Sequence, residues 1–179
     1  MEKAERFKET YGFQKAYGSY EKLLADPKVE AVYIPLPNTM HYEWTIRALK
    51  SGKHVLCEKP LAPTEAQAEE MFKAAEENHV YLMEAFAYQH SPYIAAVRKE
   101  IENGTIGDVR YMESAYITSD YDPKNIRMRR DTLGGCTYDL GVYNTSLILR
   151  ILGDEPAKVR AIASFSEEKI DTLTSAIFE

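Results

Sequence analysis

Apolar and polar positions along the first half of the chain alternate between two periods, one typical of strands and one typical of helices. Three runs rich in β-branched and aromatic residues predict strands at 29–36, 54–57 and 80–86. Helical spacing over 40–50, and again after the capping pair Thr64 and Gln67, predicts helices between these strands. Strands that alternate with helices across short loops favour a parallel sheet built from βαβ units.

Further elements are predicted ahead of this unit. Residues 2–11 form an amphipathic pattern that ends at Gly12, a residue suited to the left-handed position after a helix. Residues 14–17 predict a short strand, and Ser19 predicts the cap of a helix over 20–25.

The pattern changes near residue 90, which we interpret as a domain boundary between 1–90 and 91–179. The second part predicts a helix from Ser91-Pro92 to Asn103-Gly104, a long strand over 108–118, a polar irregular segment over 119–133, a helix over 139–152, and strands at 158–165 and 172–178. Only a short polar turn separates the last two strands, so we expect them to be antiparallel.

Composition excludes several classes of protein. The 179 residues carry a formal net charge of −6, which argues against a general nucleic-acid binder. No apolar run reaches the ~18 residues of a membrane span, and the charged start lacks the apolar core of a signal peptide. The two cysteines have no metal-ligand spacing, so we expect reduced thiols, a cytoplasmic location and no metal.

Two motifs stand out against this background. The run Cys57-Glu58-Lys59-Pro60 follows a predicted buried strand, at the edge of a parallel sheet where ligands bind. The second runs from Gly134 to Tyr143 and contains Asp139. Together they resemble the signatures of the Gfo/Idh/MocA family of nicotinamide-dependent oxidoreductases. The resemblance implies an incomplete Rossmann-type, doubly wound parallel sheet in an α/β chain, followed by part of an α+β domain with a large open, mainly antiparallel sheet.

The glycines do not complete a dinucleotide-binding motif. Such a unit opens with a strand and a Gly-x-Gly-x-x-Gly turn, and none of the nine glycines has this spacing. We therefore expect a chain truncated at both ends, without the first strand-helix-strand and the phosphate turn and ending inside a strand. Residues 31–36 would then form an unprotected sheet edge, so the isolated chain should self-associate.

The family resemblance implies hydride transfer between a nicotinamide cofactor and a sugar, polyol or trans-dihydrodiol carbon. Lys59 would contact the reacting oxygen and the nicotinamide ribose, and Tyr143 would act as general acid or base. Asp139 would orient the substrate hydroxyl or the lysine. With tyrosine at position 143, the motif resembles that of the subgroup that contains dihydrodiol dehydrogenases and glucose-fructose oxidoreductase.

The residues also allow structural roles. Asp139 and Tyr143 lie four apart and share a helix face, yet Asp139 could simply cap the helix and Tyr143 could pack in the core. Lys59 alone would read as a surface lysine. The pair Gly134-Gly135 permits close backbone approach, which we interpret as approach to a ligand.

Cofactor contacts follow from the same resemblance. They are assigned to Pro37, Asn38, His41, Glu58 and Lys59, with the choice between NAD and NADP left open. A turn residue at 38 and a satisfied histidine at 41 are the structural alternatives. Glu84 is expected to face the same crevice. Arg127, Arg129 and Arg130 are interpreted as surface charge, with one of them a candidate to meet a substrate.

Two other functions remain open at this stage. The chain could be a catalytically inactive fragment that only binds or assembles. It could also be a lyase in which Lys59 forms a Schiff base with a carbonyl substrate. For the oxidoreductase we expect a small sugar or diol as substrate, a homo-oligomer, and neither nucleic acid nor membrane as partner.

Overall fold

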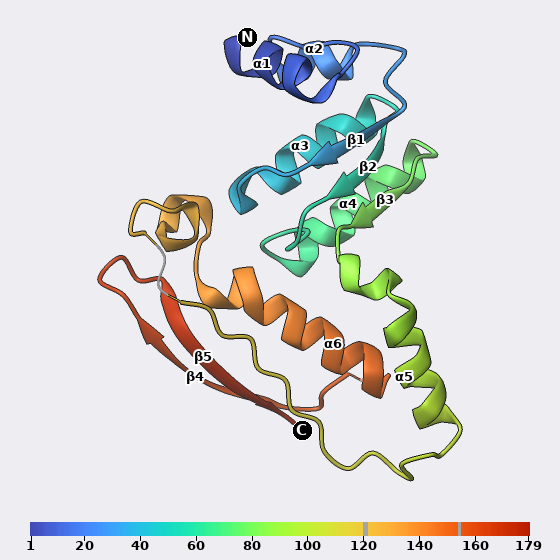
Figure 1. Ribbon diagram of the computed structural model, residues 1–179, viewed down its shortest axis with the longest axis vertical. Coiled ribbons are helices and arrows are strands. Elements are labelled where there is room, and N and C mark those ends of the chain that lie inside the picture. The colour runs from blue at the N-terminus through green and yellow to red at the C-terminus, as the bar shows by residue number, and fades with distance from the viewer. Residues whose placement is uncertain (120–121, 154) are drawn as a thin grey trace.

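The computed structural model describes residues 1–119, 122–153 and 155–179. In the first of these ranges, the strands form a three-stranded parallel sheet in the order β1-β2-β3. Its strands are β1 (Ala31–Ile34), β2 (His54–Cys57) and β3 (Leu82–Glu84), joined by helices α3 (Asn38–Lys50) and α4 (Glu65–Glu77) (Figure 1). The predicted βαβ unit is confirmed, although each outer strand is shorter than the apolar run that predicted it.

Helices α3 and α4 cover one face of this sheet. Ile34, Val55 and Cys57 point into that layer and meet Leu49 and Met71 in the buried core. The opposite face carries Tyr33, Leu56 and Met83, which lie in register across the three strands and are exposed. Parallel sheets normally bury both faces, so a single covered face is unusual for this architecture.

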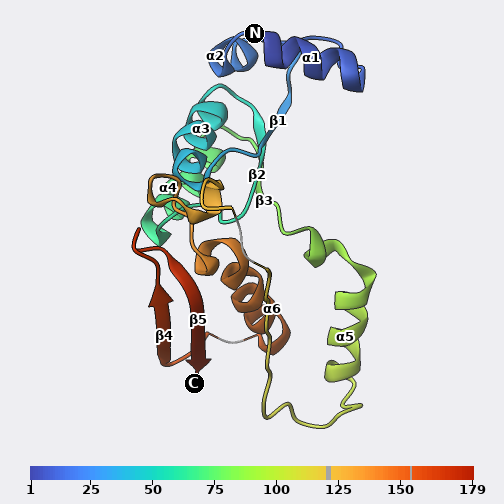
Figure 2. The ribbon, with the colours of Figure 1, turned by 60° about the vertical axis from the view of Figure 1, so that its left-hand side comes forward.

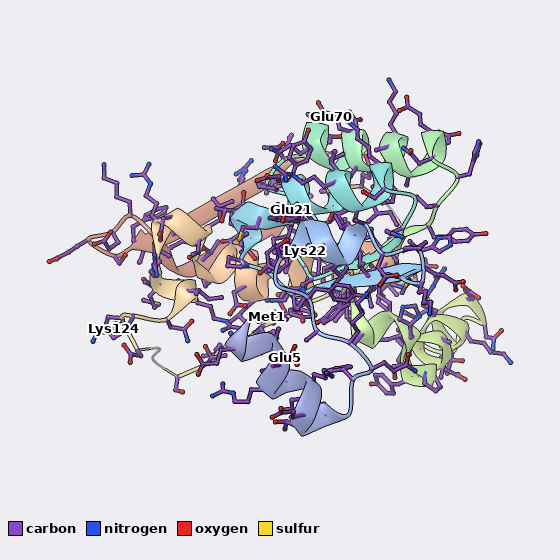
Figure 3. The ribbon with its side chains drawn as sticks, turned by 90° about the horizontal axis from the view of Figure 1, so that it is seen from above. Met1, Glu5, Glu21, Lys22, Glu70 and Lys124 are labelled. Carbon is purple, nitrogen blue, oxygen red and sulfur yellow. The ribbon has the colours of Figure 1, made fainter. Side chains whose placement is uncertain are left out.

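Helices α1 (Glu2–Tyr11) and α2 (Tyr20–Leu24) lie together at one end of the molecule, where Leu24 of α2 packs against the core and Tyr20 against Trp44 of α3 (Figures 1 and 2). No α1 residue is buried, and in the view from above this helix lies at the edge of the molecule (Figure 3). The strand predicted at 14–17 is wrong. Lys15 and Tyr17 instead bind the carboxylate of Asp26, and no neighbouring strand pairs with this segment among the described residues.

The second part of the chain combines helices with a hairpin. Helix α5 (Pro92–Glu102) follows the 3-10 turn η1 (Ala87–His90), and the 3-10 turns η2 (Ile126–Met128) and η3 (Arg130–Thr132) lie in the later loop. Strands β4 (Val159–Phe165) and β5 (Asp171–Phe178) pair antiparallel, which confirms that prediction. Helix α6 (Val142–Leu152) runs along this hairpin in both views (Figures 1 and 2).

Two predictions for this part need correction. Residues 108–118 form no strand, because no described strand offers them backbone partners and β4 pairs only with β5. The helix predicted over 139–152 begins earlier, with the π-helical turn η4 (Thr137–Gly141). Residues 120 and 121 of the predicted irregular segment lie outside the described residues. Across the described ranges, every helix is too short or too polar to cross a membrane.

Candidate active site

Lys59 stands just beyond the carboxyl end of β2 and contacts the start of the distant helix. Its Nζ donates to Oδ1 of Asp139 at 3.0 Å and to the Asp139 carbonyl oxygen at 2.5 Å. Both side chains are only 12% exposed, so the ion pair is largely shielded from water. The same Nζ lies 4.9 Å from the centre of the Tyr143 ring, over its face. The structure thus brings together the three residues predicted as catalytic.

Asp139 also binds a second cation. Nε of Arg127 donates to Oδ2 of Asp139 at 2.8 Å, while Lys59 holds Oδ1. The Arg127 side chain is 42% exposed and approaches from the pocket side. Each oxygen of a nearly buried carboxylate therefore has its own charged donor, the arrangement that makes burial of an ion tolerable.

Tyr143 lies on the first turn of α6, one helical turn after Asp139, inside a ring of aromatic side chains. Its ring centre is 5.5 Å from that of Phe86, 5.8 Å from that of Tyr116 and 6.3 Å from that of Tyr88. Burial raises the pKa of the Tyr143 phenol, and Glu58 adds to the rise, whereas Arg127 lowers this pKa. The phenol is thus a protonated donor whose proton affinity depends on nearby charge.

A pocket of about 460 Å³ opens over these groups. It is lined by Tyr33, Pro35, Asn38, Glu58, Lys59, Tyr116, Thr118, Ile126, Arg127, Thr132, Gly134, Asp139, Leu140 and Tyr143. Its floor is at the carboxyl ends of β1 and β2, the expected place for a ligand in an open parallel sheet. The Tyr33 hydroxyl donates to Oε1 of Glu58 at 2.5 Å, which raises the pKa of Tyr33 to about 12.

The predicted cofactor residues do not all reach this pocket. Asn38 lines it, and its Nδ2 donates to the Leu133 carbonyl at 2.8 Å. Pro37 precedes α3 as its N-terminal cap residue. His41 is buried, with Nδ1 at 2.7 Å from the Pro60 carbonyl oxygen and Nε2 at 2.7 Å from that of Leu36. His41 therefore ties two loops together, and its contact with a cofactor stays a prediction.

The double glycine makes close contacts, but with the protein itself. A Cβ on Gly134 would lie 2.3 Å from the Arg127 carbonyl oxygen, and one on Gly135 would lie 2.0 Å from Oδ1 of Asp171. Gly135 also has φ +111°, which side chains disfavour. The pair therefore packs against Arg127 and Asp171, while Gly134 also lines the pocket, so its approach to a ligand stays a prediction.

Asp171, at the start of β5, holds the beginning of the π-helical turn. Its Oδ2 accepts the Thr137 N–H at 2.7 Å, the Thr174 hydroxyl at 3.2 Å and the Cys136 thiol at 3.1 Å. Burial raises the pKa of Asp171, but these hydrogen bonds outweigh it and leave the pKa below its ordinary value. No sequence motif marked Asp171, because Cys136 and Thr137, the partners that it holds in the turn, lie more than 30 residues away.

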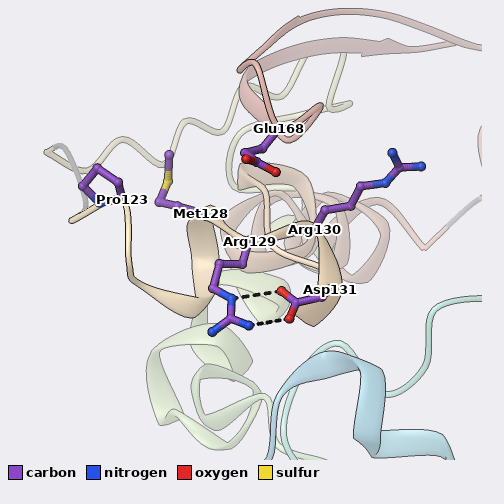
Figure 4. A pocket seen from close by; sticks show the side chains of 6 residues that line it. All are labelled: Pro123, Met128, Arg129, Arg130, Asp131 and Glu168. Carbon is purple, nitrogen blue, oxygen red and sulfur yellow. Dashed lines mark hydrogen bonds and ion pairs between the residues drawn. The ribbon is translucent and has the colours of Figure 1, made fainter.

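Other charged residues lie apart from this centre. Glu84 is part-buried and accepts the Leu61 N–H at 2.7 Å, and it is not among the residues that line the pocket. Burial raises its pKa. Arg129 binds Asp131 in a separate, open pocket of about 640 Å³, where Arg130 and Glu168 also lie (Figure 4).

Comparison with known proteins places the whole chain. A family model described as an oxidoreductase family with an NAD-binding Rossmann fold matches residues 1–86, and the GFO/IDH/MocA C-terminal domain matches residues 94–179. The chain is 34% identical over 181 residues to the trans-1,2-dihydrobenzene-1,2-diol dehydrogenase of Xenopus laevis, covering 100% of the chain and 54% of that protein.

Solved structures agree with this placement. The chain superposes with a TM-score of 0.90 and 34% identity on a 3-ketoreductase from Actinomadura kijaniata in complex with NADP and TDP-benzene, covering 98% of the chain and 54% of that structure. A levoglucosan dehydrogenase in complex with NADH and levoglucosan gives a TM-score of 0.84 and 26% identity, with 99% and 52% covered. The chain spans about half the length of the relatives it matches. Two adjacent family models, the overall fold and both signature motifs thus agree: this chain belongs to the Gfo/Idh/MocA oxidoreductase family.

Proposed function

We propose that the chain forms the substrate side of an NAD(P)-dependent oxidoreductase that transfers hydride between a nicotinamide cofactor and a sugar, polyol or trans-dihydrodiol carbon. The observation that carries this proposal is the Lys59 ammonium, held by Asp139 at 3.0 Å and lying 4.9 Å from the Tyr143 ring centre inside the pocket. The named relatives, a diol dehydrogenase, a 3-ketoreductase and a levoglucosan dehydrogenase, support this class of reaction.

Each of the three side chains has a defined task in this proposal. Lys59 presents a positive charge to the substrate oxygen, which favours a developing alkoxide. Tyr143 donates a proton to that oxygen during carbonyl reduction and accepts one during alcohol oxidation. Asp139 fixes the position of Lys59, because it binds the ammonium through both its side chain and its backbone carbonyl.

The residues at the pocket fit the nicotinamide end of a dinucleotide. When bound, such a cofactor supplies or accepts the hydride. Asn38, Glu58 and Lys59 are polar groups at the carboxyl ends of parallel strands, and they would contact its ribose and amide. Pro37 and His41 would act indirectly, by shaping the turn that carries Asn38. The sequence contains no Gly-x-Gly-x-x-Gly turn for the pyrophosphate, so we assign no residue of this chain to that group.

Further aspects of the protein belong to the same proposal. We place the division between its two parts near residue 90, supported by family models that match 1–86 and 94–179. The substrate is a small molecule, and the exposed apolar face of the parallel sheet supports a homo-oligomer. Two unpaired cysteines support a reducing, cytoplasmic location.

The lyase alternative finds no support in this geometry. Attack on a carbonyl carbon needs a free lone pair on the lysine nitrogen, whereas the Lys59 nitrogen is held by hydrogen bonds to a carboxylate and a backbone carbonyl. Borohydride trapping with a carbonyl substrate should therefore leave the mass of the protein unchanged.

Hydride transfer can be tested directly. Residues 1–179, joined to the glycine-turn unit of a relative, would be mixed with NADP or NAD and a panel of sugars and diols, and reduced cofactor followed at 340 nm. Turnover that disappears in Lys59→Met supports the proposal. Tight binding of cofactor and sugar without turnover would favour the inactive, binding-only alternative.

A further inference from the structure

The Arg127 side chain is the second cation on Asp139, and the loop around it holds its main chain from two sides. The Gly135 N–H donates to the Arg127 carbonyl at 2.8 Å, and the Arg127 N–H donates to the Asn125 side chain at 3.0 Å. Gly134 packs so closely on the same carbonyl that no side chain fits there. Arg127 is thus built into the loop in one orientation, with its guanidinium on Asp139.

A neighbouring arginine shows that this pairing is specific. Arg129 lies two residues further along and binds Asp131 in the other pocket (Figure 4). The residues that line the catalytic pocket include Arg127 and exclude Arg129 and Arg130. The path of the loop therefore places only Arg127, of these three arginines, in the pocket.

The charge of Arg127 also affects the electrostatics of the site. With Lys59 alone, the Asp139 carboxylate would cancel the lysine's charge, and little positive field would reach a substrate oxygen. With Arg127 on Oδ2 and Lys59 on Oδ1, these three side chains together carry a formal charge of +1, which the Glu58 carboxylate in the same pocket opposes.

We propose that Arg127 is a positioning residue that binds Asp139, fixes it against Lys59, and leaves the lysine's positive charge available to Tyr143 and the substrate oxygen. This inference rests on the proposed function for its catalytic meaning. The coupling of Arg127 to Tyr143 through Asp139 and Lys59 can be measured with no cofactor or substrate present.

Titration of Tyr143 reports this coupling. The titratable and charged groups that face its ring or act on its phenol are Lys59, Glu58, Tyr88, Tyr116, Arg127 and Asp139. Loss of Arg127 removes a cation and leaves the Asp139 carboxylate less neutralised. Both changes disfavour the phenolate, so the pKa of Tyr143 should rise.

The experiment uses residues 1–179 with 13Cζ-labelled tyrosine and NMR titration at rising pH, with Tyr143→Phe identifying the signal. Arg127→Gln should raise the Tyr143 midpoint by about half a pH unit or more. Arg127→Lys, which keeps the charge, should restore most of the difference. Arg129→Gln removes the same charge from the same loop and should leave the midpoint unchanged. Equal midpoints for wild type and Arg127→Gln, or equal rises in both Gln variants, would overturn the proposal.

A second measurement does not depend on how Arg127→Gln folds. In the 15N–1H spectrum of the arginine side chains, the Arg127 Nε–H should stay visible at pH 8 and should move in Asp139→Asn. An Arg127 Nε–H that exchanges as fast as those of exposed arginines would also overturn the proposal. Intact coupling in a protein without hydride transfer would instead reject the proposed function alone.

Discussion

The backbone N–H of Thr137 donates to Oδ2 of Asp171 at 2.7 Å, so a carboxylate at the start of β5 holds the turn that carries Asp139. Replacing Asp171 with Asn should lower the free energy of unfolding by about 1 kcal/mol at pH 7, the usual effect of losing a charged acceptor at a helix start. Urea unfolding measures this. Asp108→Asn, which removes an exposed ion pair with Arg110, is the matched control and should change little.

The same residue predicts a pH dependence. Because the pKa of Asp171 is lowered in the folded protein, its stabilising effect is present above the ordinary aspartate value and is lost as pH falls toward the folded pKa. Between about pH 5 and pH 3, wild type should therefore lose stability more steeply than Asp171→Asn. Parallel slopes for the two proteins would contradict the hydrogen-bond assignment.

Lys59 and Tyr143 should be required for turnover in the protein completed with a glycine-turn unit. Lys59→Ala and Tyr143→Phe should each lower the single-turnover rate by about two orders of magnitude or more, as expected for a general acid and its electrostatic partner. Tyr93→Phe, on the exposed surface of α5, should keep the wild-type rate. Near-normal rates for both site variants would remove these residues from the mechanism.

The glycines differ sharply in what a methyl group would meet. Gly134→Ala should destabilise the protein, because its Cβ would lie 2.3 Å from a backbone oxygen that cannot move freely. Gly141→Ala is the control, since its nearest neighbour would be 3.6 Å away and alanine favours helix by up to about 1 kcal/mol. Thermal unfolding should thus move in opposite directions. An unchanged melting temperature for Gly134→Ala would show that the loop yields easily.

Residues 1–179 should bind NAD(H) or NADP(H) only weakly. The pyrophosphate of a dinucleotide is normally held by a glycine turn and a helix N-terminus, and this sequence lacks such a turn. Asn38, Glu58 and Lys59 offer contacts at the nicotinamide end alone. Calorimetric titration checks this, and a dissociation constant in the low-micromolar range or tighter would disprove it.

The isolated chain should self-associate. Strand β1 has a partner on one side only among the described residues, and Tyr33, Leu56 and Met83 form an exposed apolar row across the sheet. Such edges and faces attract other chains. Sedimentation equilibrium should show oligomers, and Met83→Lys should weaken them. A monodisperse monomer with strongly protected amides over 29–36 would contradict this prediction.

Local patterns were sufficient for the elements that bury an apolar face. The runs around Ile34 and Val55 predicted their strands correctly, because each packs against α3 and α4. The strands expected at 14–17 and 108–118 failed for a physical reason. A strand exists only where another strand accepts its hydrogen bonds, and a local pattern does not show whether such a partner is present.

The site residues also divide into contacts that the sequence predicted and contacts that it could not predict. The motifs correctly grouped Lys59, Asp139 and Tyr143. They could not show which of three arginines binds Asp139, since the loop path decides this. Nor could they show that the two ring nitrogens of His41 each lie 2.7 Å from a backbone carbonyl oxygen, those of Pro60 and Leu36.

The contact between Lys59 and Asp139 joins positions 80 residues apart, one on each side of residue 90. Asn38 with Leu133, and Tyr138 with Pro63, bridge the two parts in the same way. The pocket therefore lies at the boundary between the two parts that we propose. In a state in which the two parts separate, the proposed catalytic residues are no longer together, and we expect no catalysis. By linkage, a ligand that bridges this boundary strengthens the attachment of the two parts by as much as that attachment strengthens ligand binding.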